Sequence, residues 1–139
     1  MNKKFFARGK REDTKAWVEG YLIEQNSPEY HAYIIQSFKA EIDDRHIDIL
    51  ECDIYEVIPE TVGWCTGLRD KNSTRIFEGD IVADVNCEYD KYVVNFSDER
   101  CGFFPFAKGD GCGCCEVNVL TVNFAEVIGN IHDNPELLK

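Results

Sequence analysis

The amino-acid sequence predicts a mainly β fold with at most a small helical part. Short runs of β-branched and aromatic residues recur at spacings near ten residues, and polar turn residues separate them. Helical periodicity is hard to find anywhere in the chain. About eight short strands at this spacing are typical of a small sandwich or a partly open barrel, so we expect one of these two architectures.

The first pair of strands is predicted in the N-terminal third. Residues 15–25 are rich in aromatic and branched side chains, and Asn26, Ser27 and Pro28 end the run with turn-forming residues. Residues 31–38 form a second run of the same kind. Together the two runs predict a hairpin with a longer loop.

A third strand is predicted over residues 45–54. Ile47 and Ile49 alternate with Asp48, which is the period-two pattern of a half-buried strand. The pattern continues beyond residue 54 until Pro59 stops it. These runs predict a short-stranded sheet in the N-terminal part of the chain.

The remaining strands follow a turn at residues 70–73. They are predicted over residues 75–77, 81–85, 92–96, 117–124 and 125–131. At the C-terminus, Asn134 is expected to cap a short turn with Pro135 at its first position. The sequence therefore divides into an N-terminal sheet region, residues 1–60, and a C-terminal barrel region, residues 61–139, which we expect to pack as one unit.

Composition and charge limit the partners of the chain. It has 139 residues, 44% of them hydrophobic, and a formal net charge of −11. Residues 1–11 carry five basic side chains and no acid, whereas residues 12–60 hold three basic and thirteen acidic ones. This balance does not favour direct nucleic-acid binding or an anionic membrane surface. No apolar segment long enough for a signal sequence or a membrane span follows the basic start, so a cytoplasmic location is expected.

The chain contains seven cysteines, an odd number that does not suit a secreted disulfide framework. Cys52, Cys65 and Cys87 lie in or beside apolar runs, where free cysteine behaves as a small buried hydrophobe. Cys101 and the glycine-rich stretch of residues 109–115 carry the other thiols, and the zinc-ligand candidates among them are Cys101, Cys112, Cys114 and Cys115. Their spacing lacks paired C-x2-C knuckles, so we expect a solvent-facing loop with reduced thiols and no bound cofactor.

A second candidate metal site is the triplet Asp44, His46 and Asp48. Strand alternation would place the three side chains on one face, and carboxylate and imidazole groups suit a divalent cation. The same alternation also produces an ordinary exposed polar face opposite Ile47 and Ile49. We retain the exposed polar face as the expectation and the metal site as the alternative.

The middle of the chain carries a predicted structural turn. Gly67 and Gly79 stand on either side of residues 70–73, where strand corners call for positive φ. Asp80 follows Gly79, and its carboxylate can accept hydrogen bonds from turn amides. We assign Gly67, Gly79 and Asp80 a structural role and no catalytic one.

Three segments together resemble one known family. They are FARGKR at residues 6–11, VIPETVG…TGLRDKN…RIFEGDIV between residues 57 and 82, and VIGNI…NPELL between residues 127 and 138. In this order they are similar to the YopX family of small bacteriophage and prophage proteins, over essentially the whole chain. The resemblance implies a mainly β protein with an SH3-like barrel component, a phage accessory role and a bacterial host cytoplasm. It implies no catalytic residue.

The sequence leaves three classes of function open. A non-enzymatic binding or assembly protein, with a protein partner or self-association, is favoured because no catalytic motif occurs. An acidic decoy that mimics DNA is the first alternative. A metal-dependent enzyme using the His46 or Cys112 cluster is the second. The sequence does not indicate a small-molecule ligand.

Overall fold

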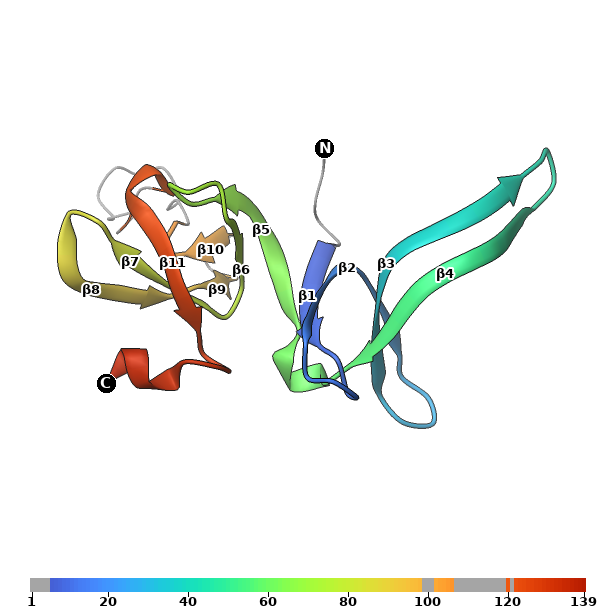
Figure 1. Cartoon of the computed structure of the whole chain (residues 1–139), viewed down its shortest axis with the longest axis horizontal. Coiled ribbons are helices and arrows are strands. Elements are labelled where there is room, and N and C mark those ends of the chain that lie inside the picture. Colours follow the sequence, from blue (N-terminus) through green and yellow to red (C-terminus); the bar gives the residue numbers. More distant parts are fainter. Residues whose placement is uncertain (1–5, 99–101, 107–119, 121) are drawn as a thin grey trace. The chain divides into compact units, whose positions relative to one another are not determined.

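The computed structural model describes residues 6–98, 102–106, 120 and 122–139, and the chain divides into two compact units (Figure 1). One unit comprises residues 5–64 and the other contains residues 65–139. Strands dominate the described residues, and the only helical elements among them are three short 3-10 turns. The predicted mainly β fold is confirmed. None of the described helices is long and apolar enough to cross a membrane.

The N-terminal unit is an antiparallel sheet in the order β4-β3-β2-β1. Its strands are β1 (Phe6–Lys10), β2 (Trp17–Gln25), β3 (His31–Ile42) and β4 (Ile47–Val57), and the 3-10 turn η1 (Pro59–Thr61) follows. The end of β4 returns to the end of β1, where Arg11 bridges Val57. The four strands therefore wrap around a small core.

Alternate residues of these strands fill that core, as the period of two requires. The buried residues are Ala7, Val18, Ala32, Ile34 and Val57. Gly20 permits a close approach of β2 to β3, because a Cβ atom there would lie 2.2 Å from the carbonyl oxygen of Ile35. Side chains on the opposite face of the sheet point away from this core.

Strand β3 is longer than the sequence pattern predicts, and β4 begins later than predicted. The predicted strand over residues 31–38 extends to Ile42, and the strand predicted to begin at residue 45 begins at Ile47. Pairing between β2 and β3 ends at Tyr21 and Ile35, but β3 and β4 remain paired as far as Ile42 and Ile47. The far half of this hairpin is therefore a two-stranded ribbon (Figure 1).

The C-terminal unit is built from short antiparallel strands. β5 (Gly63–Arg69) pairs with β6 (Arg75–Phe77). The other strands are β7 (Asp80–Asp84), β8 (Cys87–Val93), β9 (Asn95–Ser97), β10 (Gly102–Phe104) and β11 (Ala125–Asn130). They form one three-stranded sheet in the order β11-β7-β8 and one two-stranded sheet of β10 and β9. Among the described residues these strands form no closed barrel. Their core consists of Ile76, Val82, Val94, Leu120 and Ala125.

Two buried carboxylates of this unit, those of Asp80 and Asp70, accept hydrogen bonds from backbone N–H groups and so stabilise its turns. The backbone N–H of Phe77 donates to Asp80 at 2.8 Å, and Asp80 is almost completely buried. Gly67 and Gly79 have φ values of +80° and +93°. The carboxylate of Asp70 accepts hydrogen bonds from the backbone N–H groups of Asn72, Thr74 and Val127. It thereby ties the turn after β5 to β11.

Two local predictions differ from the structure near the C-terminus. Residues 122–124, predicted as part of a strand, form the 3-10 turn η2 (Val122–Phe124), and residues 117–119 and 121 lie outside the described residues. The last 3-10 turn, η3 (Pro135–Leu138), lacks a side-chain cap from Asn134. The Asn134 side chain instead accepts a hydrogen bond from the backbone N–H of Asn130 at 3.2 Å, so it closes the loop after β11.

A candidate protein-interaction surface

The far half of the β3–β4 hairpin, residues 36–53, is here called the arm. All of its residues are exposed except Ala40, which is half-buried. Among the described residues, residues 36–42 of β3 pair only with β4, so one edge of the strand is open, and residues 47–53 of β4 pair only with β3. A two-stranded ribbon is marginally stable alone and offers unpaired N–H and C=O groups along its edges.

The strand register places the apolar side chains of the arm on one face. Directly opposed residues share a face, and here the opposed pairs are Phe38 with Cys52, Ala40 with Ile49, and Ile42 with Ile47. The register shifts at Gln36 and at Leu50, and each shift leaves one extra residue. Without these two shifts, the apolar side chains of the arm, at Phe38, Ala40, Ile42, Ile47 and Ile49, would fall on the face opposite to Ile35 and Ile54.

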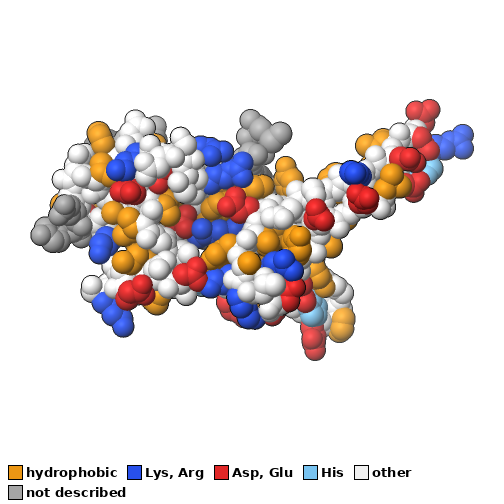
Figure 2. All heavy atoms as spheres, in the orientation of Figure 1, with side chains coloured by type: hydrophobic (Ala, Val, Ile, Leu, Met, Phe, Trp, Pro, Cys, Tyr) orange, Lys and Arg blue, Asp and Glu red, His pale blue; other side chains and the backbone are white. Residues whose placement is uncertain are grey.

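This apolar face continues over the rest of the sheet, on the side opposite the core. Register relates the arm residues to those of β2 and the first part of β3. We call the whole surface the outer face; its residues are Tyr21, Ile23, Tyr33, Ile35, Phe38, Ala40, Ile42, Ile47, Ile49, Cys52 and Ile54. Figure 2 shows hydrophobic side chains beside acidic ones along the arm.

The exposure of the outer face is high for residues of this type. Phe38, Ile42, Ile47 and Ile49 are between 59% and 73% exposed, and Tyr21, Ile23 and Ile54 are between 45% and 47% exposed. With roughly 200 Å² for each large side chain when free, these residues present on the order of 800 Å² of surface. A standard protein interface takes about 800 Å² from each partner, so the outer face is large enough for one.

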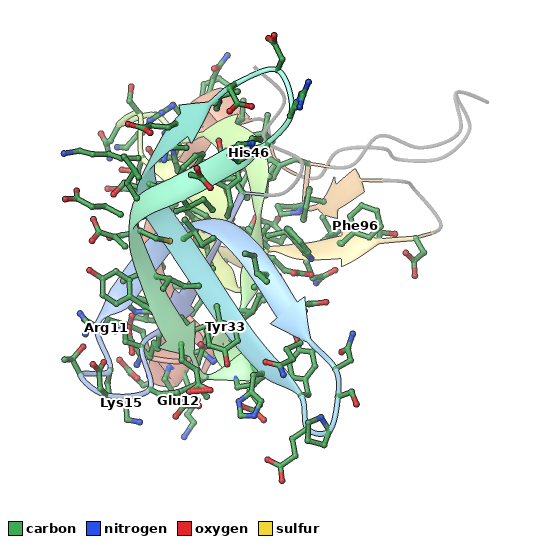
Figure 3. All side chains as sticks on the ribbon, turned by 90° about the vertical axis from the view of Figure 1, so that its right-hand side faces the viewer. Arg11, Glu12, Lys15, Tyr33, His46 and Phe96 are labelled. Carbon is green, nitrogen blue, oxygen red and sulfur yellow. The ribbon has the colours of Figure 1, made fainter. Side chains whose placement is uncertain are left out.

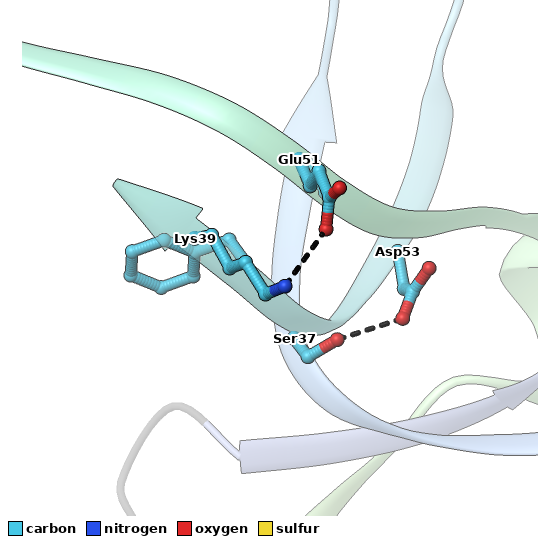
Figure 4. Close-up of a pocket in the computed structure, with 6 residues that line it drawn as sticks. Ser37, Lys39, Glu51 and Asp53 are labelled. Carbon is cyan, nitrogen blue, oxygen red and sulfur yellow. Dashed lines mark hydrogen bonds and ion pairs between the residues drawn. The ribbon is translucent and has the colours of Figure 1, made fainter. Parts of the chain in front are cut away.

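The opposite face of the arm is polar. Ser37 donates a hydrogen bond to Asp53 at 2.7 Å, and the ammonium group of Lys39 lies 3.4 Å from the carboxylate of Glu51 (Figure 4). These residues and Phe38 and Cys52 line a shallow hollow of about 270 Å³. In the third polar pair, Glu41 lies opposite Asp48, so two carboxylates occupy opposed positions. The arm holds two basic and six acidic side chains, a balance of −4.

At the tip of the arm, Asp44, His46 and Asp48 are not arranged as the sequence predicts. Asp44 and His46 lie in the connecting turn, because β4 begins at Ile47, so the three residues do not share a strand face. The His46 ring lies 3.2 Å from Asp43 and 3.3 Å from Asp48, all three exposed to solvent (Figure 3). Asp43 also accepts hydrogen bonds from the N–H groups of Arg45 and His46, which makes it the turn-forming residue. No group of three candidate metal ligands forms among the described residues.

The described cysteines differ from the expectation that all three would be buried. Cys65 is buried beside β6, but Cys52 and Cys87 are exposed. Cys52 is exposed because no described residue forms a layer over the arm. The zinc-ligand candidates Cys101, Cys112, Cys114 and Cys115 lie outside the described residues, as does the loop of residues 109–115.

The base of the arm carries an aromatic and basic cluster. The guanidinium group of Arg11 lies over the Tyr55 ring, 4.2 Å from its centroid, and donates two hydrogen bonds to Asp13. The hydrogen bond from Arg11, followed by one from the Thr14 N–H, lowers the pKa of the Asp13 carboxyl. These residues border a depression of about 390 Å³ beside Ile54. The cluster fastens the β1–β2 turn to β4.

Sequence reasoning missed the outer face because alternation alone does not show what covers a strand. Ile47 and Ile49 were expected to be half-buried, and that expectation is wrong: both are more than 60% exposed. The usable signal was the similar alternation in β3, at Phe38, Ala40 and Ile42. Two adjacent strands with this pattern beyond the reach of a third strand predict an uncovered ribbon.

The comparisons with known proteins agree with this architecture. The family model described as YopX protein matches residues 7–139. Among solved structures, the chain is similar to the crystal structure of protein EF1440 from Enterococcus faecalis, with 26% sequence identity and a TM-score of 0.61. That match covers 96% of this chain and 97% of the other. No curated protein matches the sequence. The family match covers nearly the whole chain, and the chain therefore belongs to the YopX family.

Proposed function

We propose that this chain is a non-enzymatic protein-binding module, acting as an accessory protein of a bacteriophage or prophage in the bacterial cytoplasm. The outer face is the binding surface, and the exposed apolar side chains of the arm are the observation that supports it. Contiguous apolar surface of this size is uncommon on proteins that act alone and is typical of interaction sites.

The charge of the arm defines the chemistry of the partner. Glu41, Asp48, Glu51 and Asp53 lie on the polar face of the same ribbon, behind the apolar residues, and Asp43 and Asp44 lie in the turn at its end. A protein surface with apolar side chains at its centre and Lys or Arg at its rim complements this arrangement. Phosphate backbones and anionic lipid headgroups would be repelled by the same carboxylates.

The test is capture of partners from host cells with the tagged protein, followed by purification of the identified partner and direct titration. We expect Ile47→Ser with Ile49→Ser to weaken the binding of that purified partner at least a hundredfold. The control carries Val85→Ser with Leu138→Ser, which also removes two exposed apolar side chains, and it should bind like the wild type. The association rate should fall as salt rises, since oppositely charged rims steer the encounter.

Two results would overturn this proposal. If the Ile47→Ser, Ile49→Ser variant and the control bound the partner equally well, the binding site would lie outside the arm. Binding that duplex DNA competes away, and that survives the arm variant, would instead support the acidic decoy function.

A further inference from the structure

We propose that two copies of this chain pair along the open edge of β3, antiparallel and about a twofold axis at Ala40, to form a four-stranded platform. The inference deepens the proposed function and rests on it, because the platform joins two outer faces into one surface. The observations that support the pairing of two copies all concern the edge of β3.

The first observation is the length and openness of that edge. Residues 36–42 of β3 pair with β4 on one side, and β2 pairs only as far as Ile35. Every second residue of this segment directs its backbone N–H and C=O groups outward. An edge of this length normally carries protection against pairing or receives another strand.

The second observation is that the edge is complementary to itself. With the axis at Ala40, Phe38 of one copy opposes Ile42 of the other, and Lys39 opposes Glu41. The two apolar pairs fall on the outer face and the two ion pairs fall on the polar face, because neighbouring residues alternate. Moving the axis by one residue places Lys39 opposite Lys39 or Glu41 opposite Glu41, so the charges select one register.

The third observation concerns Glu41. It lies directly opposite Asp48 in the β3–β4 pair, and like charges in this position destabilise a sheet. No cation pairs with Glu41 in the part of the chain that the structure describes. In the proposed dimer, the partner copy's lysine at position 39 supplies that cation. Lys39 keeps its own contact with Glu51, 3.4 Å away, in the same row of charges.

The test measures the dimer dissociation constant of the full chain by sedimentation velocity over a concentration series. Wild type should dimerise, and Glu41→Lys should weaken the dimer at least tenfold, because two attractive pairs become two repulsive ones. Within one chain the same change places a cation opposite Asp48, so it should not unfold the arm. A purely intrachain role for Glu41 therefore predicts no loss of dimer.

Charge exchange provides the control. Lys39→Glu alone should also weaken the dimer, whereas Lys39→Glu combined with Glu41→Lys should restore it, because the exchanged charges again oppose each other. An equimolar mixture of the two single variants should form a heterodimer, since one edge then carries two cations and the other two anions. Hydrogen exchange of the amides at 36–42 should slow as the wild-type concentration rises.

Several outcomes would overturn the inference. A monomer at all concentrations would refute it, while binding of the purified partner by that monomer would leave the proposed function standing. A dimer insensitive to all three charge variants but lost with Ile47→Ser and Ile49→Ser would be a face-to-face dimer, which contradicts edge pairing. Failure of the double variant to restore the dimer would exclude the register at Ala40.

Discussion

Asp70 is a buried carboxylate whose charge is used for structure. It is 7% exposed and accepts three backbone N–H bonds of 2.8 to 2.9 Å, two within its own turn and one from Val127. Burial alone would raise the pKa of Asp70, but the three hydrogen bonds outweigh burial and the pKa lies below its ordinary value. The ionised form is therefore the one that the fold prefers.

We predict that Asp70→Asn lowers the free energy of unfolding by about 2 kcal/mol at pH 7. An amide offers one acceptor oxygen, so at least one of the three N–H groups loses its partner. A group whose folded pKa is depressed stabilises above its unfolded pKa, and this stabilisation disappears as the pH falls through the folded value. Denaturant unfolding should therefore show the difference between variant and wild type shrinking from pH 5 to pH 3.

The control for this prediction is Asp44→Asn in the exposed turn of the arm. Asp44 has no hydrogen bond or ion pair among the described residues, so its replacement should change stability by less than about 0.5 kcal/mol at either pH. A pH-independent loss at position 70 would show that shape, and not charge, accounts for the role of Asp70.

Gly79 is the second position where one residue determines a turn. Its φ is +93°, its N–H donates to the carbonyl of Val94 at 2.8 Å, and its carbonyl accepts from Ile131 at 2.9 Å. We predict that Gly79→Val lowers the free energy of unfolding by about 2 kcal/mol or more, because β-branched residues rarely adopt positive φ. Gly79→Asn should lose less, since asparagine tolerates this region better. Unchanged thermal stability of the valine variant would contradict the turn assignment.

At the scale of elements, the two faces of one strand pair should respond differently to the same change. Ile34 in β3 is completely buried and Ile49 in β4 is 63% exposed. We predict that Ile34→Ala lowers the free energy of unfolding by about 3 kcal/mol, through lost burial and the cavity left behind. Ile49→Ala should cost less than about 1 kcal/mol. Equal losses, measured by denaturant titration, would mean that the outer face is covered within the chain.

Most elements could be predicted from the sequence because local patterning determines them. Neighbouring residues determine the alternation in β2 and β3 and the turns at 26–28 and 70–73. The structure contains these strands. The exposure of Ile47, Ile49 and Cys52 could not be predicted, because it depends on where β2 stops pairing with β3. The register shifts at Gln36 and Leu50 leave no sequence signal of their own, yet they collect the apolar residues on one face.

At the scale of the whole molecule, the chain has two separate hydrophobic cores. Ile34 belongs to the core of the N-terminal unit, and Val82 belongs to the core of the unit that contains residues 65–139. A core substitution destabilises the cooperative unit in which its side chain packs. Each core should therefore control the opening of its own unit.

Hydrogen exchange with mass spectrometry of the full chain can separate the two units. We predict that Ile34→Ala accelerates exchange in β1 to β4 and leaves β7 and β11 unchanged, because the lost contacts lie in one core only. Val82→Ala should give the reverse pattern, with faster exchange in β7, β8 and β11. Each variant serves as the control for the other, since both remove completely buried methyl groups. If either substitution accelerated exchange equally in all strands, residues 5–64 and 65–139 would unfold as one cooperative unit, and the two cores would be energetically coupled.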